Sequence, residues 1–179
     1  MKKSLKKGFT LVELVIVIAV IAILSAVLIP TFGNVIQNSK NTAAYQNASN
    51  ALNGYITNQA EQEQSASLSA GYIVVFTSAQ EYKEGTTTQF DLDDTVYIFE
   101  YDGNSVNKID GKFVKGTSSA KVSITGLKAE KTENAATYSK WTTTESVTAI
   151  PLNYKFTANG VSASVWWVKT NPVGTTTGA

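Results

Sequence analysis

The sequence predicts an α+β protein in which one long N-terminal helix precedes a region of antiparallel β-strands. Three observations lead to this prediction: an apolar segment near the N-terminus, helical spacing of apolar residues after it, and short β-type segments from Gly71 onward. The 179 residues suffice for one ordinary domain with an anchoring segment beside it. Hydrophobic residues make up 43% and charged residues 16%, which excludes compositional disorder and a protein with several membrane spans.

The apolar segment has the length of a membrane span. Residues 9–29 contain eighteen apolar residues out of twenty-one, interrupted only by Thr10, Glu13 and Ser25. As a helix this segment is about 30 Å long, which matches the hydrocarbon core of a bilayer. Four lysines precede it, so the positive-inside rule places everything after Pro30 outside the cell. A secretory signal peptide is the alternative, but the segment is long for one and no good cleavage site follows it.

A second helical stretch follows directly and is predicted to run to about Glu61. Its apolar residues recur on one face, which should pack on a globular domain: Val35, Ile36, Ala43, Ala44, Ala48, Ala51, Leu52, Tyr55 and Ile56. Pro30 removes one backbone donor at the junction and Gly33 adds backbone freedom. The two residues therefore predict a bend or a meltable point, with a simple kink between two helices as the alternative.

Two strands are predicted in the middle of the chain, at residues 72–77 and 95–101, from their β-branched and aromatic residues. The turn signals Asp102-Gly103 and Asp110-Gly111 would make residues 95–114 a small meander. Residues 81–88, 116–120 and 171–179 are predicted as loops or a frayed end.

The clearest hairpin lies near the C-terminus, with Asn159-Gly160 as its predicted turn. Alternating apolar residues on its two strands indicate one core-facing side: Leu152, Tyr154, Phe156, Val161, Ala163, Val165 and Trp167. Trp166 shares the opposite face with Ser162 and Ser164. We therefore expect Trp166 at the surface, as a rim residue covered by a loop or as a subunit contact.

Charge and composition exclude several classes of function. All fifteen basic residues are lysine, and removal of the first eight residues leaves eleven lysines against fourteen acids, a side-chain charge of −3. That balance disfavours nucleic acid as the main partner. The chain has no cysteine and no histidine, so disulfides, Ser-His and Cys-His nucleophiles and most zinc sites are excluded.

The remaining motifs for chemistry are weak, and we expect neither an enzyme nor a cofactor. Residues 105–108 and 118–121 match the Ser-x-x-Lys pattern, but the companion motifs of such enzymes are absent. Asp91, Asp93, Asp94 and Asp102 could gather around calcium, yet the twelve-residue loop pattern is missing. Turn and strand-edge roles are the preferred interpretation of these acids.

The N-terminus resembles the class III signal of type IV prepilins. The residues that carry this resemblance are Lys6-Lys7-Gly8-Phe9-Thr10-Leu11-Val12-Glu13, followed by a single apolar stretch and by Pro30. The motif covers about thirty residues, and beyond it the likeness is one of architecture. Thr10 and Glu13 also fit a capping box, which would explain Glu13 locally, and Gly8-Phe9 could be the ordinary start of a helix. In lacking cysteine, the chain resembles the pilins of Gram-positive bacteria.

This resemblance implies a pilin-like fold and a three-part organisation. Residues 1–8 would be a leader, residues 9–30 a transmembrane and assembly helix, and residues 31–179 an extracellular domain whose half-helix packs on the sheet. A prepilin peptidase would cut between Gly8 and Phe9 and methylate the new amine of Phe9. The chain would then polymerise with copies of itself on the pilus assembly platform, passing from the cytoplasmic membrane to the cell surface.

Glu13 is the ionisable residue inside the apolar segment and therefore a candidate for subunit assembly. Two other functions stay open at this stage. A competence or type II secretion pseudopilin would share the same N-terminus, although the calcium-binding C-terminal loop of the major secretion pseudopilin has no counterpart, since residues 146–179 contain no acid. A membrane-anchored monomeric adhesin or binding module would belong to a different class.

Overall fold

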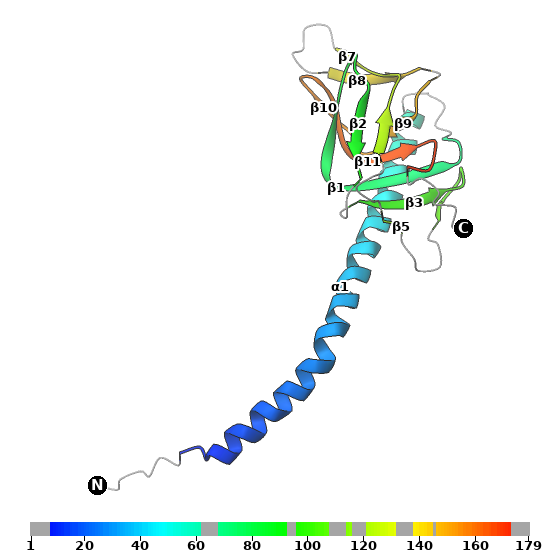
Figure 1. The fold of residues 1–179 in the computed structure, drawn as a ribbon. Coiled ribbons are helices and arrows are strands. Elements are labelled where there is room, and N and C mark those ends of the chain that lie inside the picture. The colour runs from blue at the N-terminus through cyan, green and yellow to red at the C-terminus, as the bar shows by residue number, and fades with distance from the viewer. Residues whose placement is uncertain are drawn as a thin grey trace, which may run out of the picture. The chain divides into compact units, whose positions relative to one another are not determined.

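The computed structural model describes residues 8–61, 68–92, 96–107, 114–115, 121–131, 138–144 and 146–172. The chain divides into two compact units, Met1–Lys40 and Asn41–Ala179. Helix α1 runs from Leu11 to Glu61, so the first unit contains its N-terminal part and the second contains the remainder with the strands (Figure 1). The predicted α+β, pilin-like class, with one long apolar N-terminal helix and an antiparallel sheet, is confirmed.

The strands of the second unit form one larger sheet and two small ones. The larger sheet has the strand order β10-β11-β1-β3-β4, with β5 paired to β3 and β9 paired to β11, and all its pairs are antiparallel. The small sheets are β2-β6 and β7-β8. The bounds are β1 Gly71–Lys83, β2 Thr88–Asp91, β3 Tyr97–Tyr101, β4 Val106–Asn107, β5 Val114–Lys115, β6 Lys121–Ile124, β7 Leu127–Lys131, β8 Tyr138–Thr143, β9 Ala149–Pro151, β10 Lys155–Thr157 and β11 Gly160–Val168.

Helix α1 covers one face of the larger sheet within the second unit. Its buried residues from Asn41 onward follow helical spacing: Asn41, Ala44, Ala48, Leu52 and Tyr55. The Tyr45 ring meets Phe99 of β3 edge to face at 5.7 Å, and the Tyr45 hydroxyl donates to the Val106 carbonyl at 3.2 Å. Phe99 pairs with Ile73, and Ile73 pairs with Trp167, so these three side chains share the face that meets the helix.

The opposite face of the same sheet is also buried. Ile98, Val74 and Trp166 are direct partners across β3, β1 and β11 and therefore share this second face. Phe90 of β2 covers it, with its ring centroid 5.4 Å from that of Trp166. The second unit consequently has three layers: the helix, the larger sheet, and the small sheet that contains β2.

The expectation that Trp166 lies at the surface is wrong, because Trp166 is 0% exposed and Trp167 is 4% exposed. Alternation places one face of a strand in solvent only where the sheet has a solvated face, whereas the centre of this sheet is buried on both faces. The Trp166 indole N–H donates to the Ala163 carbonyl at 2.9 Å, which satisfies the polar atom that burial would otherwise leave unpaired. Trp166 is a core residue, and neither the rim nor the subunit-contact interpretation survives.

The C-terminal hairpin is present, but its turn is displaced by one residue. Thr157 pairs with Gly160, so the two turn residues are Ala158 and Asn159 rather than Asn159 and Gly160. Gly160 begins β11 with φ of 149°, and an added Cβ there would collide with the Tyr82 carbonyl oxygen. Glycine is therefore required at position 160 by the close approach of β1.

The predicted loop at residues 81–88 is wrong at both ends. Gln80–Lys83 pair with Gly160–Ala163 after a register shift that follows Val75, so β1 continues to Lys83. Thr88 begins β2. The pairing partner, which lies about eighty residues further along the chain, recruits polar residues that local propensity assigns to a loop.

The predicted meander is only partly correct. Asp102-Gly103 forms a turn between β3 and β4 as expected, with Gly103 at φ of 96°. However, β5 pairs with β3 and not with β4. The second turn signal, Asp110-Gly111, lies outside the described residues.

The packed part of α1 begins later than its apolar pattern predicts. Val35 and Ile36 are 58% and 54% exposed, although both belong to the expected packing face. Burial begins at Asn41, which coincides with the start of the second unit. Residues 31–40 are exposed on every side, and they extend the exposed part of the helix beyond the predicted membrane span.

Candidate processing and assembly segment

A capping box begins helix α1. Thr10 is non-helical and Leu11 is the first helical residue. The Glu13 Oε2 atom accepts hydrogen bonds from the Thr10 backbone N–H at 2.8 Å and from the Thr10 hydroxyl at 2.6 Å. In return the Glu13 backbone N–H donates to Thr10 Oγ1 at 3.3 Å. The two residues thus satisfy backbone donors that the start of a helix leaves without intrahelical partners.

The capping geometry confirms the local interpretation of Glu13 without excluding a second role. Both bonds from Thr10 reach the same carboxylate oxygen, Oε2, so neither of them uses Oε1. A carboxylate offers about four acceptor positions, and the capping box occupies two of them. Glu13 is exposed, which leaves the carboxylate accessible to a second donor.

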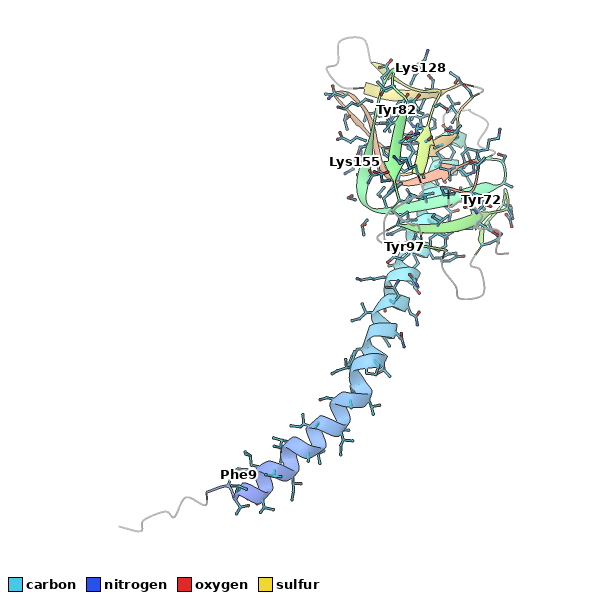
Figure 2. All side chains as sticks on the ribbon, in the orientation of Figure 1. Phe9, Tyr72, Tyr82, Tyr97, Lys128 and Lys155 are labelled. Atoms are coloured by element: carbon cyan, nitrogen blue, oxygen red, sulfur yellow. The ribbon has the colours of Figure 1, made fainter. Side chains whose placement is uncertain are left out.

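Gly8 and Phe9 precede the cap in non-helical, exposed backbone. A Cβ added at Gly8 would meet no atom within 4 Å, and the Phe9 side chain is 87% exposed (Figure 2). Among the described residues no part of the chain covers this peptide bond. Its geometry is therefore that of an accessible segment adjoining a well-capped helix.

The helix that follows exposes its apolar side chains all around its axis, as Figure 2 shows for the part that begins at Phe9. It is the one helix in the described part of the chain that is long and apolar enough to cross a membrane, a test that signal sequences and core helices can also pass. The large apolar side chains exposed within the described residues all belong to this segment: Phe9, Leu11, Val12, Leu14, Val15, Ile16, Val17, Ile18, Val20, Ile21, Ile23, Leu24, Val27, Leu28, Ile29, Phe32, Val35 and Ile36.

Pro30 lies inside α1, and the helix continues through it. Proline has no N–H to donate, so one intrahelical hydrogen bond is missing at this point. By helical spacing the missing bond is the one to the Ala26 carbonyl, and the Thr31 hydroxyl donates to two other carbonyls, those of Leu28 at 2.8 Å and Val27 at 3.3 Å. A Cβ added at Gly33 would meet no atom within 4 Å, so packing does not require glycine there.

The other candidate residues serve the fold. Asp102 holds the β3–β4 turn by accepting 2.8 Å hydrogen bonds from the backbone N–H groups of Ser105 and Asn104, which lower the pKa of its carboxyl. Asp91 pairs with Lys121 on the neighbouring strand at 3.4 Å. Asp93, Asp94 and the Ser-x-x-Lys residues 108 and 118–120 lie outside the described residues.

Neither a metal site nor a catalytic constellation emerges from the described part of the chain. That part contains no group of three or more acidic side chains that could hold a metal ion. A groove of about 390 Å³ beside β1 and β3 is lined by Tyr72, Glu100, Asn107 and Lys169 among others, but it is open. The distinctive surface of this chain is therefore the N-terminal apolar segment.

Comparison with known proteins independently singles out the same segment. Residues 3–29 match the family described as the prokaryotic N-terminal methylation motif. Type IV major fimbrial protein FimA sequences from Dichelobacter nodosus are 58% identical to this chain over 38 residues. The aligned part is 21% of this chain, and the chain spans about a quarter of the length of these relatives, 24%. No solved structure matches the chain.

The motif match covers residues 3–29 and the exposed apolar side chains run from Phe9 to Ile36, so the two overlap, and the similarity to a major fimbrial protein adds a second sequence match. Two of these observations come from sequence comparison and one from the fold. The resemblance inferred from residues 6–13 is thereby confirmed. The N-terminal segment of this chain thus carries the prokaryotic N-terminal methylation motif, and part of the chain is similar to a type IV major fimbrial protein.

Proposed function

We propose that this chain is a structural subunit of an extracellular type IV pilus filament, matured by a prepilin peptidase and assembled through its N-terminal helix. The observation that carries the proposal is the exposed apolar part of α1, most of which lies within the residues that match the methylation motif. A soluble chain cannot leave eighteen large apolar side chains in water, because each costs roughly 1.5–3 kcal/mol relative to burial. The segment needs lipid or copies of itself.

Maturation is the first step of the proposed function. The peptidase would cut between Gly8 and Phe9 and methylate the amine of Phe9, which removes residues 1–8 as a leader. Because a Cβ at Gly8 would meet no atom within 4 Å in the described part of the chain, Gly8→Leu should leave the fold unchanged. Accumulation of uncut Gly8→Leu precursor would then report on fit within the peptidase.

Before assembly, residues 9–30 would anchor the precursor in the cytoplasmic membrane, with residues 31–179 outside. Transfer from lipid into a filament gains little from the hydrophobic effect, because lipid is already apolar. The gain must come from packing between helices and from polar contacts. Pro30 and Gly33 would supply a bend or a locally meltable point, since the helix lacks one backbone hydrogen bond there.

Glu13 would supply the polar contact that sets the register between subunits. A charged acid near the centre of a bilayer costs roughly 2.5–3.5 kcal/mol, a cost that is lower near the membrane face. Cleavage before Phe9 creates a cationic amine at nearly the same depth on each incoming subunit. The Glu13 oxygen Oε1, which the Thr10 bonds do not use, can accept a hydrogen bond from that amine while the capping box persists. A single buried charge pair resists sliding, whereas a uniform apolar surface does not.

Two alternatives remain as outcomes of the tests. A competence or secretion pseudopilin would mature in the same way, with the pilus assembly platform and the peptidase as shared partners. A monomeric membrane-anchored adhesin would keep residues 1–8 or lose the whole apolar segment. The absence of acids from residues 146–179 argues against the calcium-binding secretion type.

The primary experiment is terminal mass analysis of material sheared from the cell surface. We expect a chain that begins at Phe9 with a methylated amine, recovered as a filament visible by electron microscopy. A monomer that retains residues 1–8, or one that begins beyond residue 30, would reject the proposed function. Correct maturation without surface filaments would favour the pseudopilin.

Variants at Glu13 test the assembly step separately. We expect Glu13→Ala to be inserted and largely processed, because Thr10 Oγ1 can still accept the backbone N–H of residue 13, but to assemble poorly. Glu13→Asp should be intermediate because its side chain is shorter. If Glu13→Ala gave normal filament yield, the capping box alone would account for this residue.

A further inference from the structure

The capping box also determines where helical backbone stops. Thr10 is the N-cap, and the two residues before it, Gly8 and Phe9, are non-helical as well. The bond that the proposed function assigns to the peptidase, Gly8–Phe9, therefore lies just outside the helix. Only one residue, Thr10, lies between Phe9 and the first helical residue, Leu11.

A peptide bond must be extended to be cut. Peptide-binding clefts hold their partners largely through main-chain hydrogen bonds of the β type, which need free N–H and C=O groups. In a helix these groups are already paired along the axis and the carbonyl is enclosed by the neighbouring turn. A helical Gly8–Phe9 bond would consequently be a poor substrate.

Without the cap, α1 could extend toward the N-terminus by one turn. The amides at positions 11–13 would then bond to the carbonyls of residues 7–9, which is the ordinary helical pattern. Lysine, the residue at positions 6 and 7, is a good helix former, and only Gly8 opposes the extension. The hydrogen bond from the Glu13 N–H to Thr10 Oγ1 replaces one of the bonds that extension would provide.

We propose that Thr10 is a positioning residue for maturation: its hydroxyl ends α1 at Leu11 and thereby keeps the Gly8–Phe9 bond in the extended form that a peptidase can bind. This inference rests on the proposed function, because it presumes cleavage at that bond. It assigns Thr10 a role through backbone conformation and not through contact with the peptidase.

The decisive variants separate the shape of Thr10 from its capping ability. Valine has the shape of threonine without an acceptor, whereas serine and asparagine differ in shape but are good N-caps. We expect Thr10→Val to be processed roughly five-fold more slowly, the ratio typical of losing one N-cap. Thr10→Ser and Thr10→Asn should stay within about two-fold of the parent. Thr31→Val is the matched control, since Thr31 is in the helix interior, and it should process normally.

Two readouts are needed. Conversion of full-length precursor to mature chain is followed in cells by pulse labelling, with membrane insertion checked for every variant. The backbone conformation is followed by the carbonyl and α-carbon chemical shifts of labelled Phe9 in the full-length precursor in detergent. We expect these shifts to move toward helical values in Thr10→Val and to stay extended in Thr10→Ser and Thr10→Asn.

Each outcome discriminates between this inference and its alternatives. Slow processing of both Thr10→Val and Thr10→Asn would mean that the peptidase reads the threonine itself, which overturns the inference. Slow processing of Thr10→Val with Phe9 still extended would overturn it as well, as would a normal rate for that variant. If the parent chain is not cut after Gly8 at all, the proposed function fails instead.

Discussion

Replacement of Trp166 by alanine tests the three-layer core of the second unit. The Trp166 side chain projects from β11 and is fully buried, and the Phe90 ring of β2 lies against it. A large aromatic side chain removes about 150–250 Å² from water, which at about 25 cal/mol per Å² corresponds to about 4–6 kcal/mol. This figure is an upper bound because the unfolded chain already buries part of the surface. Aromatic-to-alanine substitutions in cores cost about 3–5 kcal/mol, so we expect Trp166→Ala to lose about that much stability.

A second variant at this position separates packing from hydrogen bonding. Trp166→Phe keeps most of the contact with Phe90 but removes the N–H that donates to the Ala163 carbonyl. We expect a cost of about 1–3 kcal/mol from the unpaired carbonyl and the smaller ring. Lys169→Ala is the control, because Lys169 is exposed just after β11, and it should change stability by no more than about 0.5 kcal/mol.

The assay is urea unfolding of the full chain in detergent, followed by circular dichroism in the β region. The midpoint gives the change in free energy of unfolding when the slope is unchanged. A loss below about 1 kcal/mol for Trp166→Ala would refute the reasoning, because a side chain covered only by a loose loop at the rim costs that little.

Three further predictions concern the second unit. A chain limited to residues 34–179 should be folded and monomeric in solution, since the packed half of α1 begins at Asn41; unfolded circular dichroism or filament formation would contradict this. Gly160→Ala should cost about 1–3 kcal/mol, because a Cβ would meet the Tyr82 carbonyl at a backbone angle that favours glycine. Gly85→Ala shares an unfavourable backbone angle, with φ of 80°, but has open space around its Cβ, so it should cost less in the same unfolding assay. Burial raises the pKa of the Tyr55 hydroxyl above its ordinary value of 10.0. The stability contributed by the neutral, buried hydroxyl is therefore fully present below pH 10 and should fall as the pH rises further. Tyr55→Phe should weaken this fall in a pH series of unfolding curves.

Some of the candidate site was predictable from sequence because its signals are local. The apolar run, the Thr10–Glu13 capping box and the helix end at Glu61 each depend on residues within a few turns of one another. The Asp102-Gly103 turn is local for the same reason, since Asp102 accepts from backbone groups two and three residues ahead. Local hydrogen bonds and periodicity need no knowledge of the rest of the fold.

The two central strands of the larger sheet contain a sequence signal for burial on both faces, which the alternating pattern obscures. Residues 73–76 and 165–168 are continuous apolar runs, and all eight residues are buried. Continuous runs are typical of strands buried on both faces, whereas alternation is typical of strands with one solvated face. Reading residues 161–167 as alternating assigned Trp166 to solvent, although the run Val165-Trp166-Trp167-Val168 favours burial on both sides.

The sequence by itself determined the N-terminal third of this protein: a capped, apolar helix preceded by a lysine-rich segment, with a prepilin-like motif. Only the tertiary structure decided that Trp166 is core, that β1 continues to Lys83, and that the hairpin turn lies one residue before Gly160. The physical reason is the range of the interactions. Helix capping and membrane-length hydrophobicity are properties of neighbouring residues, whereas the burial of Trp166 depends on Phe90, and the glycine at position 160 depends on Tyr82, each more than seventy residues away in the chain.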